Sequence, residues 1–288
     1  MRRYAIAGVF VALVLLCAGL LFPAVQKIRG AAAQMACQSH FKQLALALHN
    51  YADTYPLSAP EERVTRSAFP AGTVSSATLP PEQRLSWIVL ILPFFEQDKV
   101  FKQFDLTRGP GDPVNAVPAR NRFQMLVCHA SGEREYDTDT RTEQWRSPSP
   151  LTHYVGVSGV GADAAELPLG HPRAGVFGYD RRTALTDIRD GTSNTLLLIE
   201  TANNPGHCAY GGFATVRGFE PDATPYLGPG RAFGGFHNGG AVLFGERSHT
   251  CNAAMADGAV KAFTRATAPE VLEALATVGG KEELPTNW

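Results

Sequence analysis

A short segment between Asp187 and Asn194 carries side chains of the kind that bind calcium. Asp187, Asp190, Ser193 and Asn194 present carboxylate, hydroxyl and amide oxygens, and Ca²⁺ is held by such oxygens. No glutamate stands at an offset suited to bidentate binding. The same residue types are typical of a hydrogen-bonded turn that closes a hairpin. The segment is a candidate Ca²⁺ site through Asp187, Asp190 and Asn194, and a plain turn without any cofactor is the competing interpretation.

Histidine and serine side chains elsewhere lack the spacing that known catalytic or metal motifs require. No H-x-x-x-H or H-x-H spacing unites His207, His237 and His249, and no C-x-x-C pair is present to build a thiol-based zinc site. Ser193 does not lie in a G-x-S-x-G elbow, and there is no glycine-rich phosphate loop. We therefore predict no catalytic residue, no resident metal of these kinds and no enzymatic activity.

Five cysteines form the remaining reactive group. Cys17 lies in an apolar run near the N-terminus, which leaves an even number beyond it: Cys37, Cys128, Cys208 and Cys251. If this part of the chain is exported to an oxidising compartment, an even number of cysteines predicts two disulfides. Three pairings are possible. Cys208 with Cys251 and Cys37 with Cys128 is the preferred one, and four buried free thiols are the alternative.

The N-terminal residues resemble a membrane anchor. Tyr4 to Phe22 contains no charged residue, and its length as a helix, about 28 Å, nearly matches a hydrocarbon core of about 30 Å. Arg2 and Arg3 precede the run with the α-amino group, whereas Lys27 and Arg29 follow it, so the charge difference that favours a cytoplasmic N-terminus is small. A cleaved secretory signal ending near Ala31-Ala32-Ala33 is the alternative, but the apolar run is long for a signal and ends well before these alanines.

The chain beyond the apolar run is acidic. Four of the 26 Lys and Arg residues fall within residues 1–29, so 22 remain against 27 Asp and Glu. A domain with this balance does not have the basic surface that nucleic-acid binding requires. We therefore predict that nucleic acid is not a partner.

One long helix should position the first part of the domain. Apolar residues recur in steps of three and four at Cys37, Phe41, Leu44, Leu48 and Tyr51, which is one face of a helix. The absence of Gly and Pro from Ala31 to Tyr51 predicts that the helix is uninterrupted there. This face should pack against the domain, while Lys42, Gln43 and Asn50 should face solvent.

The rest of the chain predicts short helices followed by a β-rich region. Pro56 to Pro81 reads as an irregular connection, and two short helices should meet at Pro93, although a buried strand at Trp87–Leu92 competes with the first of them. Asp190-Gly191 and Asp257-Gly258 should form turns, and a final helix should span Pro269–Thr277. The predicted antiparallel strands are Phe123–Cys128, His153–Val157, Thr195–Ile199, Ala241–Phe244 and Ala259–Phe263.

Several segments together resemble one family, the planctomycete prepilin-like proteins that contain domain of unknown function 1559. The resemblance runs through most of the chain. Its motifs are Leu21–Gln26, Cys37 with Phe41–Tyr51, Ser86–Gln97, Ile188–Thr195, and a C-terminal signature formed by His249, Asn252, Asp257 and Gly258.

Two departures from the family pattern are informative. Members usually have a longer spacing between the histidine and Asp-Gly than His249 and Asp257 have, and His237-Asn238-Gly239-Gly240 resembles their His-Pro-Gly-Gly, so the equivalent histidine is left open. Prepilin-like proteins also normally carry a glutamate where this chain has Leu13. The missing glutamate favours a permanent single-pass anchor over a processed filament subunit.

The sequence and the resemblance together imply an α+β protein, pilin- or pseudopilin-like, with a long N-terminal helix on a mainly antiparallel sheet. Residues 1–29 would form the cytoplasmic tip and transmembrane anchor, and residues 30–288 an extracytoplasmic domain at the bacterial inner membrane. The expected function is that of a structural or interaction protein linked to a type II secretion or pilus-like system, with pilin-like subunits or cell-surface proteins as partners. An extracytoplasmic solute- or glycan-binding module is the alternative.

Overall fold

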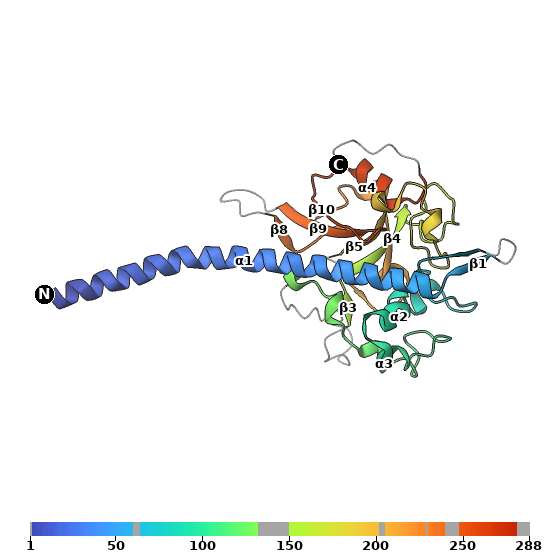
Figure 1. Ribbon diagram of the computed structural model, residues 1–288, viewed down its shortest axis with the longest axis horizontal. Coiled ribbons are helices and arrows are strands. Elements are labelled where there is room, and N and C mark those ends of the chain that lie inside the picture. Colours follow the sequence, from blue (N-terminus) through green and yellow to red (C-terminus); the bar gives the residue numbers. More distant parts are fainter. Residues whose placement is uncertain are drawn as a thin grey trace.

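The computed structural model describes residues 2–59, 64–131, 150–201, 205–228, 230–239 and 248–280. A single helix, α1 (Arg2–Thr54), opens the chain and continues through Pro23 without a break. Its C-terminal part lies in the domain and its N-terminal part projects far beyond it (Figure 1). The predicted uninterrupted helix over Ala31–Tyr51 is confirmed and forms part of this longer element.

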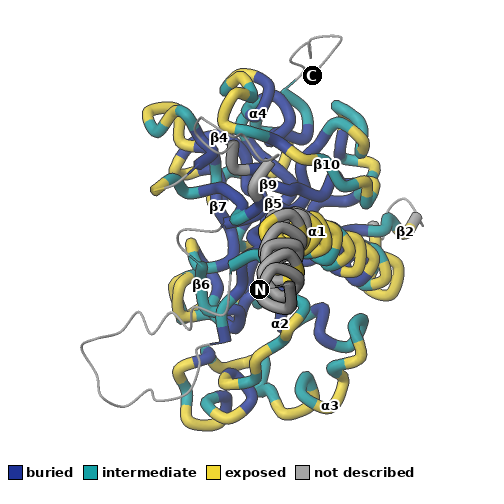
Figure 2. The backbone as a smooth tube through the Cα atoms, turned by 90° about the vertical axis from the view of Figure 1, so that its left-hand side faces the viewer, coloured by how far each residue is buried: buried dark blue, intermediate teal, exposed yellow. Residues whose placement is uncertain are grey.

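The C-terminal half of α1 buries the apolar face that its periodicity predicts. Cys37, Phe41, Leu44 and Leu48 are fully buried, while Lys42, Gln43 and Asn50 are exposed. The small side chains of Ala45, Ala47 and Ala52 are also buried and let the helix approach its neighbours closely. Figure 2 shows α1 between the central sheet and the short helix α2 (Trp87–Ile91).

A six-stranded sheet forms the centre of the domain. Its order is β10-β9-β5-β4-β7, with β8 paired to β9. All pairs are antiparallel except β4 with β7, which is parallel, so the predicted antiparallel sheet is in fact mixed at one edge. The strands are β4 (Tyr154–Val160), β5 (Leu196–Glu200), β7 (Val216–Phe219), β8 (His237–Gly239), β9 (Ser248–Met255) and β10 (Val260–Phe263).

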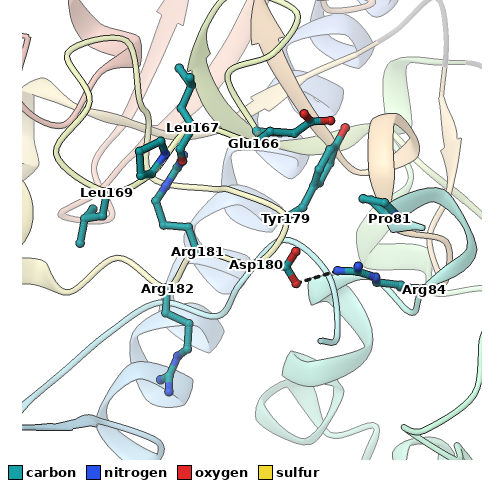
Figure 3. Close-up of a pocket in the computed structure, with 11 residues that line it drawn as sticks. Pro81, Arg84, Glu166, Leu167, Leu169, Tyr179, Asp180, Arg181 and Arg182 are labelled. Carbon is teal, nitrogen blue, oxygen red and sulfur yellow. Dashed lines mark hydrogen bonds and ion pairs between the residues drawn. The ribbon is translucent and has the colours of Figure 1, made fainter. Parts of the chain in front are cut away.

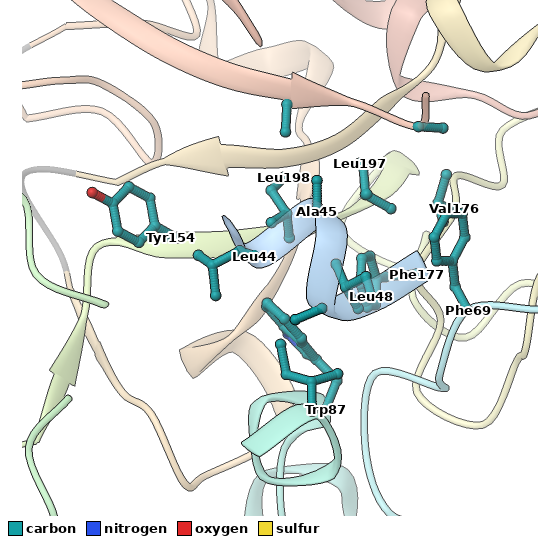
Figure 4. Packing of buried hydrophobic residues seen from close by; sticks show 14 of the residues in the cluster. Leu44, Ala45, Leu48, Phe69, Trp87, Tyr154, Val176, Phe177, Leu197 and Leu198 are labelled. Carbon is teal, nitrogen blue, oxygen red and sulfur yellow. The ribbon is translucent and has the colours of Figure 1, made fainter. Parts of the chain in front are cut away.

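Each face of the sheet is covered by a different helix, which explains why β4 and β5 are buried on both sides. On one face, Leu197 and Leu198 pack with Leu44 and Leu48 of α1 and with Trp87 (Figure 4). The opposite face packs against α4 (Pro269–Ala276) in a second apolar cluster. The protein is therefore α+β, as the sequence predicts, with α1 built into its core.

The region before the sheet is made of short helical turns. Helix α2 ends in a 3₁₀ turn that contains Pro93, and α3 (Asp98–Phe101) follows. The predicted pair of short helices is confirmed, and the competing strand at Trp87–Leu92 is wrong. Trp87 is fully buried, and its indole nitrogen donates a hydrogen bond of 3.0 Å to the carbonyl of Thr215.

Two small strand pairs and several 3₁₀ turns complete the fold. Strands β1 (Leu57–Ala59) and β2 (Val64–Arg66) pair within the predicted irregular connection, and β3 (Leu151–Thr152) pairs with β6 (Gly206–His207). The 3₁₀ turns span Pro81–Gln83, Leu92–Phe95, Pro118–Arg120, Gln124–Leu126, His129–Ser131, Leu185–Asp187, Thr192–Asn194, Gly212–Ala214 and Pro221–Ala223.

The predicted strands have mixed outcomes. The structure places strands within or close to three of them, at β4, β5 and β10, and the final helix is confirmed at α4. A strand at Phe123–Cys128 is wrong, because this segment forms a 3₁₀ turn with no strand partner in the described residues. Ala241–Phe244 lies outside the described residues.

The N-terminal apolar run is described only in part. Its backbone is helical, but most side chains of Tyr4–Phe22 lie outside the described residues. In the part of the chain that the structure describes, no helix combines the length and apolar character needed to span a membrane.

Candidate functional site

Four buried side chains that can bind metal converge where α1 crosses the sheet. Cys37 comes from α1, and Cys128 from the segment that leads into the His129–Ser131 turn. Glu200 is the last residue of β5, and His237 is the first residue of β8. The fold thus collects them from four separate parts of the chain, and we call them the Cys/His/Glu cluster.

The cluster is compact and closed to solvent. The two sulfur atoms of Cys37 and Cys128 are 3.1 Å apart, and the Cys128 sulfur lies 3.5 Å from Nε2 of His237. The same Nε2 is 3.0 Å from Oε1 of Glu200. One ligand atom from each of the four residues lies within 4.8 Å of all the others, and each of the four residues is buried.

Hydrogen bonds from β9 fix the carboxylate of Glu200. The backbone N–H of Asn252 donates to Oε2 over 2.7 Å, and the Asn252 side-chain amide lies 3.2 and 3.3 Å from the two oxygens. Gly235 makes room for this arrangement, because a Cβ there would lie 2.5 Å from Oε2 and 2.0 Å from the carbonyl oxygen of Thr250. The carboxylate is therefore held in position by the amides of Asn252 and by its contact with His237.

Burial and mutual contact shift the protonation of the cluster. Burial raises the pKa of Glu200, and the hydrogen bond and charge of His237 offset part of that rise. Burial alone lowers the pKa of His237, but its contacts with Cys37 and Glu200 outweigh burial and raise that pKa to about 9. The hydrogen bond between the two sulfurs lowers the pKa of Cys37 and raises that of Cys128. The contacts within the cluster therefore act against burial in setting the pKa of both Glu200 and His237.

The imidazole ring of His237 is oriented with its Nε2 atom toward the cluster. Its Nδ1 is buried and has no hydrogen-bond partner in the described part of the structure. Its polar contacts are made instead through Nε2, the atom that faces Cys128 and Glu200.

The predicted calcium ligands form hydrogen bonds and an ion pair with other residues of the chain. Asp187 pairs with Arg66 and accepts the backbone N–H of Ala184, while Asp190 accepts the N–H of Gly280 over 3.0 Å. Asn194 donates to the backbone carbonyl of Asp190. Within the described residues these acids do not gather into a group of three potential ligands, and the turn precedes β5 rather than closing a hairpin.

The C-terminal motif residues take separate roles. Asn252 supports Glu200, whereas Asp257 and Gly258 form the turn between β9 and β10. Asp257 accepts the N–H of Ala259 over 2.8 Å, and Gly258 has a φ of 85°. The side chain of His249 lies outside the described residues. The turn predicted at Asp257-Gly258 is thus confirmed.

All four cysteines beyond the apolar run are buried as free thiols. Cys37 and Cys128, one of the preferred pairs, have their sulfurs in contact. Cys208 and Cys251 belong to different apolar clusters on the two faces of the sheet, so the structure does not bring the other preferred pair together. Disulfide formation itself stays a prediction.

A surface pocket lies away from the cluster. It has a volume of about 660 Å³ and is lined by residues that include Arg84, Tyr179 and Asp180 (Figure 3). Arg84 and Asp180 form an ion pair of 2.6 Å across it. Arg181 braces the wall by donating hydrogen bonds to the carbonyls of Gly175 and Phe177, and its burial lowers its pKa to about 10.

Comparison with known proteins identifies the family. A family model described as "Protein of unknown function (DUF1559)" matches residues 26–270. The chain belongs to this family. No curated protein and no solved structure matches the chain. Family membership thus confirms the resemblance drawn from the motifs, and the Cys/His/Glu cluster lies within the matched residues.

Proposed function

We propose that this DUF1559 protein is a membrane-anchored, extracytoplasmic, prepilin-like protein with a structural or interaction role. Its N-terminal apolar run would hold it in the bacterial inner membrane, and α1 would serve as the packing surface for neighbouring subunits. A type II secretion or pilus-like system is the setting that the prepilin resemblance suggests. Two features of α1 support the proposal.

The first feature is that helix α1 is continuous from the apolar run into the domain. Helix α1 joins the apolar run Tyr4–Phe22 to the buried residues Phe41, Leu44 and Leu48 without interruption. Residues 2–30 would extend by roughly 43 Å at about 1.5 Å per residue. An anchor that is continuous with the core holds the domain at a set distance from the membrane, which suits an ordered assembly better than a flexible tether does.

The second feature is an outward apolar stripe, and it is the observation that carries the proposal. Ile28, Met35 and Leu46 are 68%, 64% and 60% exposed. Met35 stands seven residues after Ile28, and Leu46 stands eleven after Met35, so at about 100° per residue the three fall within roughly 20° of one direction. Seven- and eleven-residue apolar repeats are typical of helices that pack on other helices.

This stripe lies opposite the face that the domain buries. Leu44 and Leu48 stand two residues before and after Leu46, and a separation of two residues turns a helix by about 200°. The helix therefore has one apolar face for its own core, and its opposite, exposed side carries large apolar residues interspersed with Ser39 and Lys42. Exposed apolar residues that gather on one side of a helix offer a partner a surface to pack against.

Site-specific photo-crosslinking in membranes tests the proposal. A photoreactive amino acid at Leu46 should crosslink to a neighbouring protein chain, whereas the same residue at Val117, a 67% exposed position on the domain, should not. Equal or absent crosslinking at the two positions would contradict a packing role for α1.

Membrane attachment is tested by a paired substitution. Leu13→Lys with Leu16→Lys places two charges in the apolar run and should move the protein from the membrane fraction to the soluble fraction, because lysine inside a bilayer costs about 3 kcal/mol per residue. Leu46→Lys adds a charge outside the run and should leave the protein in the membrane fraction. Unchanged partitioning of the double variant would rule out this segment as the anchor.

Solute or glycan binding is the second candidate function. The pocket beside Arg84, Tyr179 and Asp180 offers an aromatic ring and both signs of charge, which is the mixture that small polar ligands require. Tyr154, Tyr210 and Tyr226 are not among the residues that line it, and Trp145 lies outside the described residues. A screen of sugars and amino acids by thermal shift, compared with Arg84→Ala, would test this function.

A further inference from the structure

We infer that Cys37, Cys128, Glu200 and His237 form a closed, four-coordinate site for a divalent transition-metal ion, and that Zn²⁺ is the ion their donor set fits. Two thiolates, one imidazole nitrogen and one carboxylate oxygen are all ligands that zinc takes in tetrahedral sites. Calcium and magnesium prefer oxygen donors only, so the sulfurs exclude them as the natural occupant.

The spacing of the donors is close to that of a tetrahedral zinc centre. With Zn–S bonds of about 2.3 Å and Zn–N bonds of about 2.0 Å, neighbouring ligand atoms are separated by roughly 3.3–3.8 Å. The observed separations are 3.1 Å between the sulfurs, 3.5 Å from Cys128 to His237 and 3.0 Å from His237 to Glu200. An ion at the centre would push these atoms apart by less than about 1 Å.

The buried negative charge of Glu200 is a second reason to expect a bound cation. Glu200 is 1% exposed, and a buried carboxylate beside two cysteines needs a positive partner. Binding of Zn²⁺ would displace the proton between His237 Nε2 and the carboxylate and any thiol protons of Cys37 and Cys128, so metal uptake releases protons. The ion would then supply positive charge beside the buried Glu200 carboxylate.

The surroundings of the ligands resemble a metal site's supporting shell. The backbone and side-chain amides of Asn252 hold the Glu200 carboxylate, and the Cys128 N–H donates to Nδ1 of His153 over 3.3 Å. Such outer contacts orient ligands and raise affinity. Since all four ligands are buried, the site has no open position for substrate and serves structure, fastening α1 to the sheet.

The predicted Cys37–Cys128 disulfide and a bound ion are exclusive uses of the same two sulfurs. A disulfide would account for the cysteines but leave the convergence of His237 and Glu200 on them without a role. The experiment therefore uses the reduced full-length protein in detergent, stripped of metal with a chelator that is then removed.

Titration of this protein with Zn²⁺ against a chromophoric chelator should show one tightly bound equivalent. Cys37→Ser and Glu200→Gln should each weaken binding by more than about 100-fold, since loss of a ligand costs at least as much as loss of an outer contact. Cys208→Ser, which removes a buried thiol outside the cluster, should bind as the unsubstituted protein does. Circular dichroism verifies that each variant is folded.

Cobalt gives a readout that does not depend on any variant. Co²⁺ added to the reduced, unsubstituted protein should produce the intense thiolate-to-cobalt charge-transfer absorption of a site with cysteine ligands, and Zn²⁺ should abolish it. Absence of a stoichiometric Zn²⁺ equivalent, absence of this absorption, or undiminished binding by folded Cys37→Ser would each overturn the inference.

Discussion

Glu200 places a carboxylate in the buried interior of the domain. Its carboxylate ends an otherwise apolar strand, is almost completely shielded from solvent, and contacts His237 and Asn252. A buried carboxylate left without such partners would cost several kcal/mol. Asn252 is therefore a supporting residue, and its presence in the C-terminal motif has a structural explanation.

Replacing Asn252 tests this role. Asn252→Ala removes the side-chain amide but keeps the backbone N–H, so it should lower the free energy of unfolding by about 1–3 kcal/mol because Glu200 loses hydrogen bonds. The exposed Asn50 on α1 provides the same substitution without burial, and Asn50→Ala should change stability by less than about 0.5 kcal/mol. Denaturant unfolding of both variants measures the difference, and equal values would show that the Glu200–Asn252 contact contributes nothing.

Single residues were predictable only where a local pattern identifies them. The turn at Asp257-Gly258 follows from residue types that tolerate positive φ, and the structure confirms it. The Cys/His/Glu cluster does not follow from local spacing, since Cys37 and Cys128 are 91 residues apart and no C-x-x-C motif joins them. The one available signal was Glu200, an acid directly after the apolar run Leu196–Ile199, because a charge at the end of a buried strand requires a partner.

At the scale of elements, α1 has a buried apolar face and an exposed side that also carries large apolar residues. The inner face packs with Trp87 and the sheet (Figure 4). The outer face contains Ile28, Met35 and Leu46 and is exposed. Substitutions on the two faces should therefore affect different properties.

Leucine truncations separate the two faces. Leu44→Ala and Leu48→Ala should each lower the free energy of unfolding by about 2–5 kcal/mol, through lost transfer energy and a cavity. Leu46→Ala is the matched control and should change it by less than about 0.5 kcal/mol, because Leu46 is 60% exposed. Thermal unfolding of the three proteins measures this contrast. If Leu44→Ala and Leu48→Ala leave the midpoint unchanged, α1 is not part of the core.

Glycine replacements test the turn between β9 and β10. A Cβ at residue 258 would meet only the Ala45 side chain, at an ordinary 3.8 Å, so the cost of Gly258→Ala comes from its φ of 85°. We expect a loss of about 1–2 kcal/mol. Gly30 lies within α1 with no neighbour in reach of an added Cβ, and Gly30→Ala should be neutral or stabilising by up to about 1 kcal/mol. A similar effect at both positions would contradict the backbone explanation.

Elements with a clear period were predictable, and the others were not. The long helix, the helices flanking Pro93 and the final helix follow from apolar spacing and proline positions. Strands β7 and β9 were missed because β7 contains Arg217 and β9 contains Asn252, polar residues that are buried through hydrogen bonds rather than exposed. Phe123–Cys128 has strand-forming residue types but no neighbouring strand to pair with among the described residues.

For the whole molecule, the arrangement links an N-terminal helix to a mixed α+β domain (Figure 1). The family and the fold class follow from the sequence, since the motifs span most of the chain. The mixed edge of the sheet does not, because the parallel pairing of β4 with β7 joins segments with no repeat or motif in common. The proposed function requires that α1 anchors this domain outside the cytoplasm.

Labelling of single introduced cysteines in spheroplasts tests that claim most directly. A membrane-impermeant maleimide should label Val117→Cys in intact spheroplasts, because Val117 is exposed on the domain, and the four buried native thiols of the domain should stay unreactive. Arg3→Cys, on the predicted cytoplasmic side, should react only after the membrane is permeabilised. If Val117→Cys also reacts only after permeabilisation, the domain faces the cytoplasm and the proposed topology is wrong.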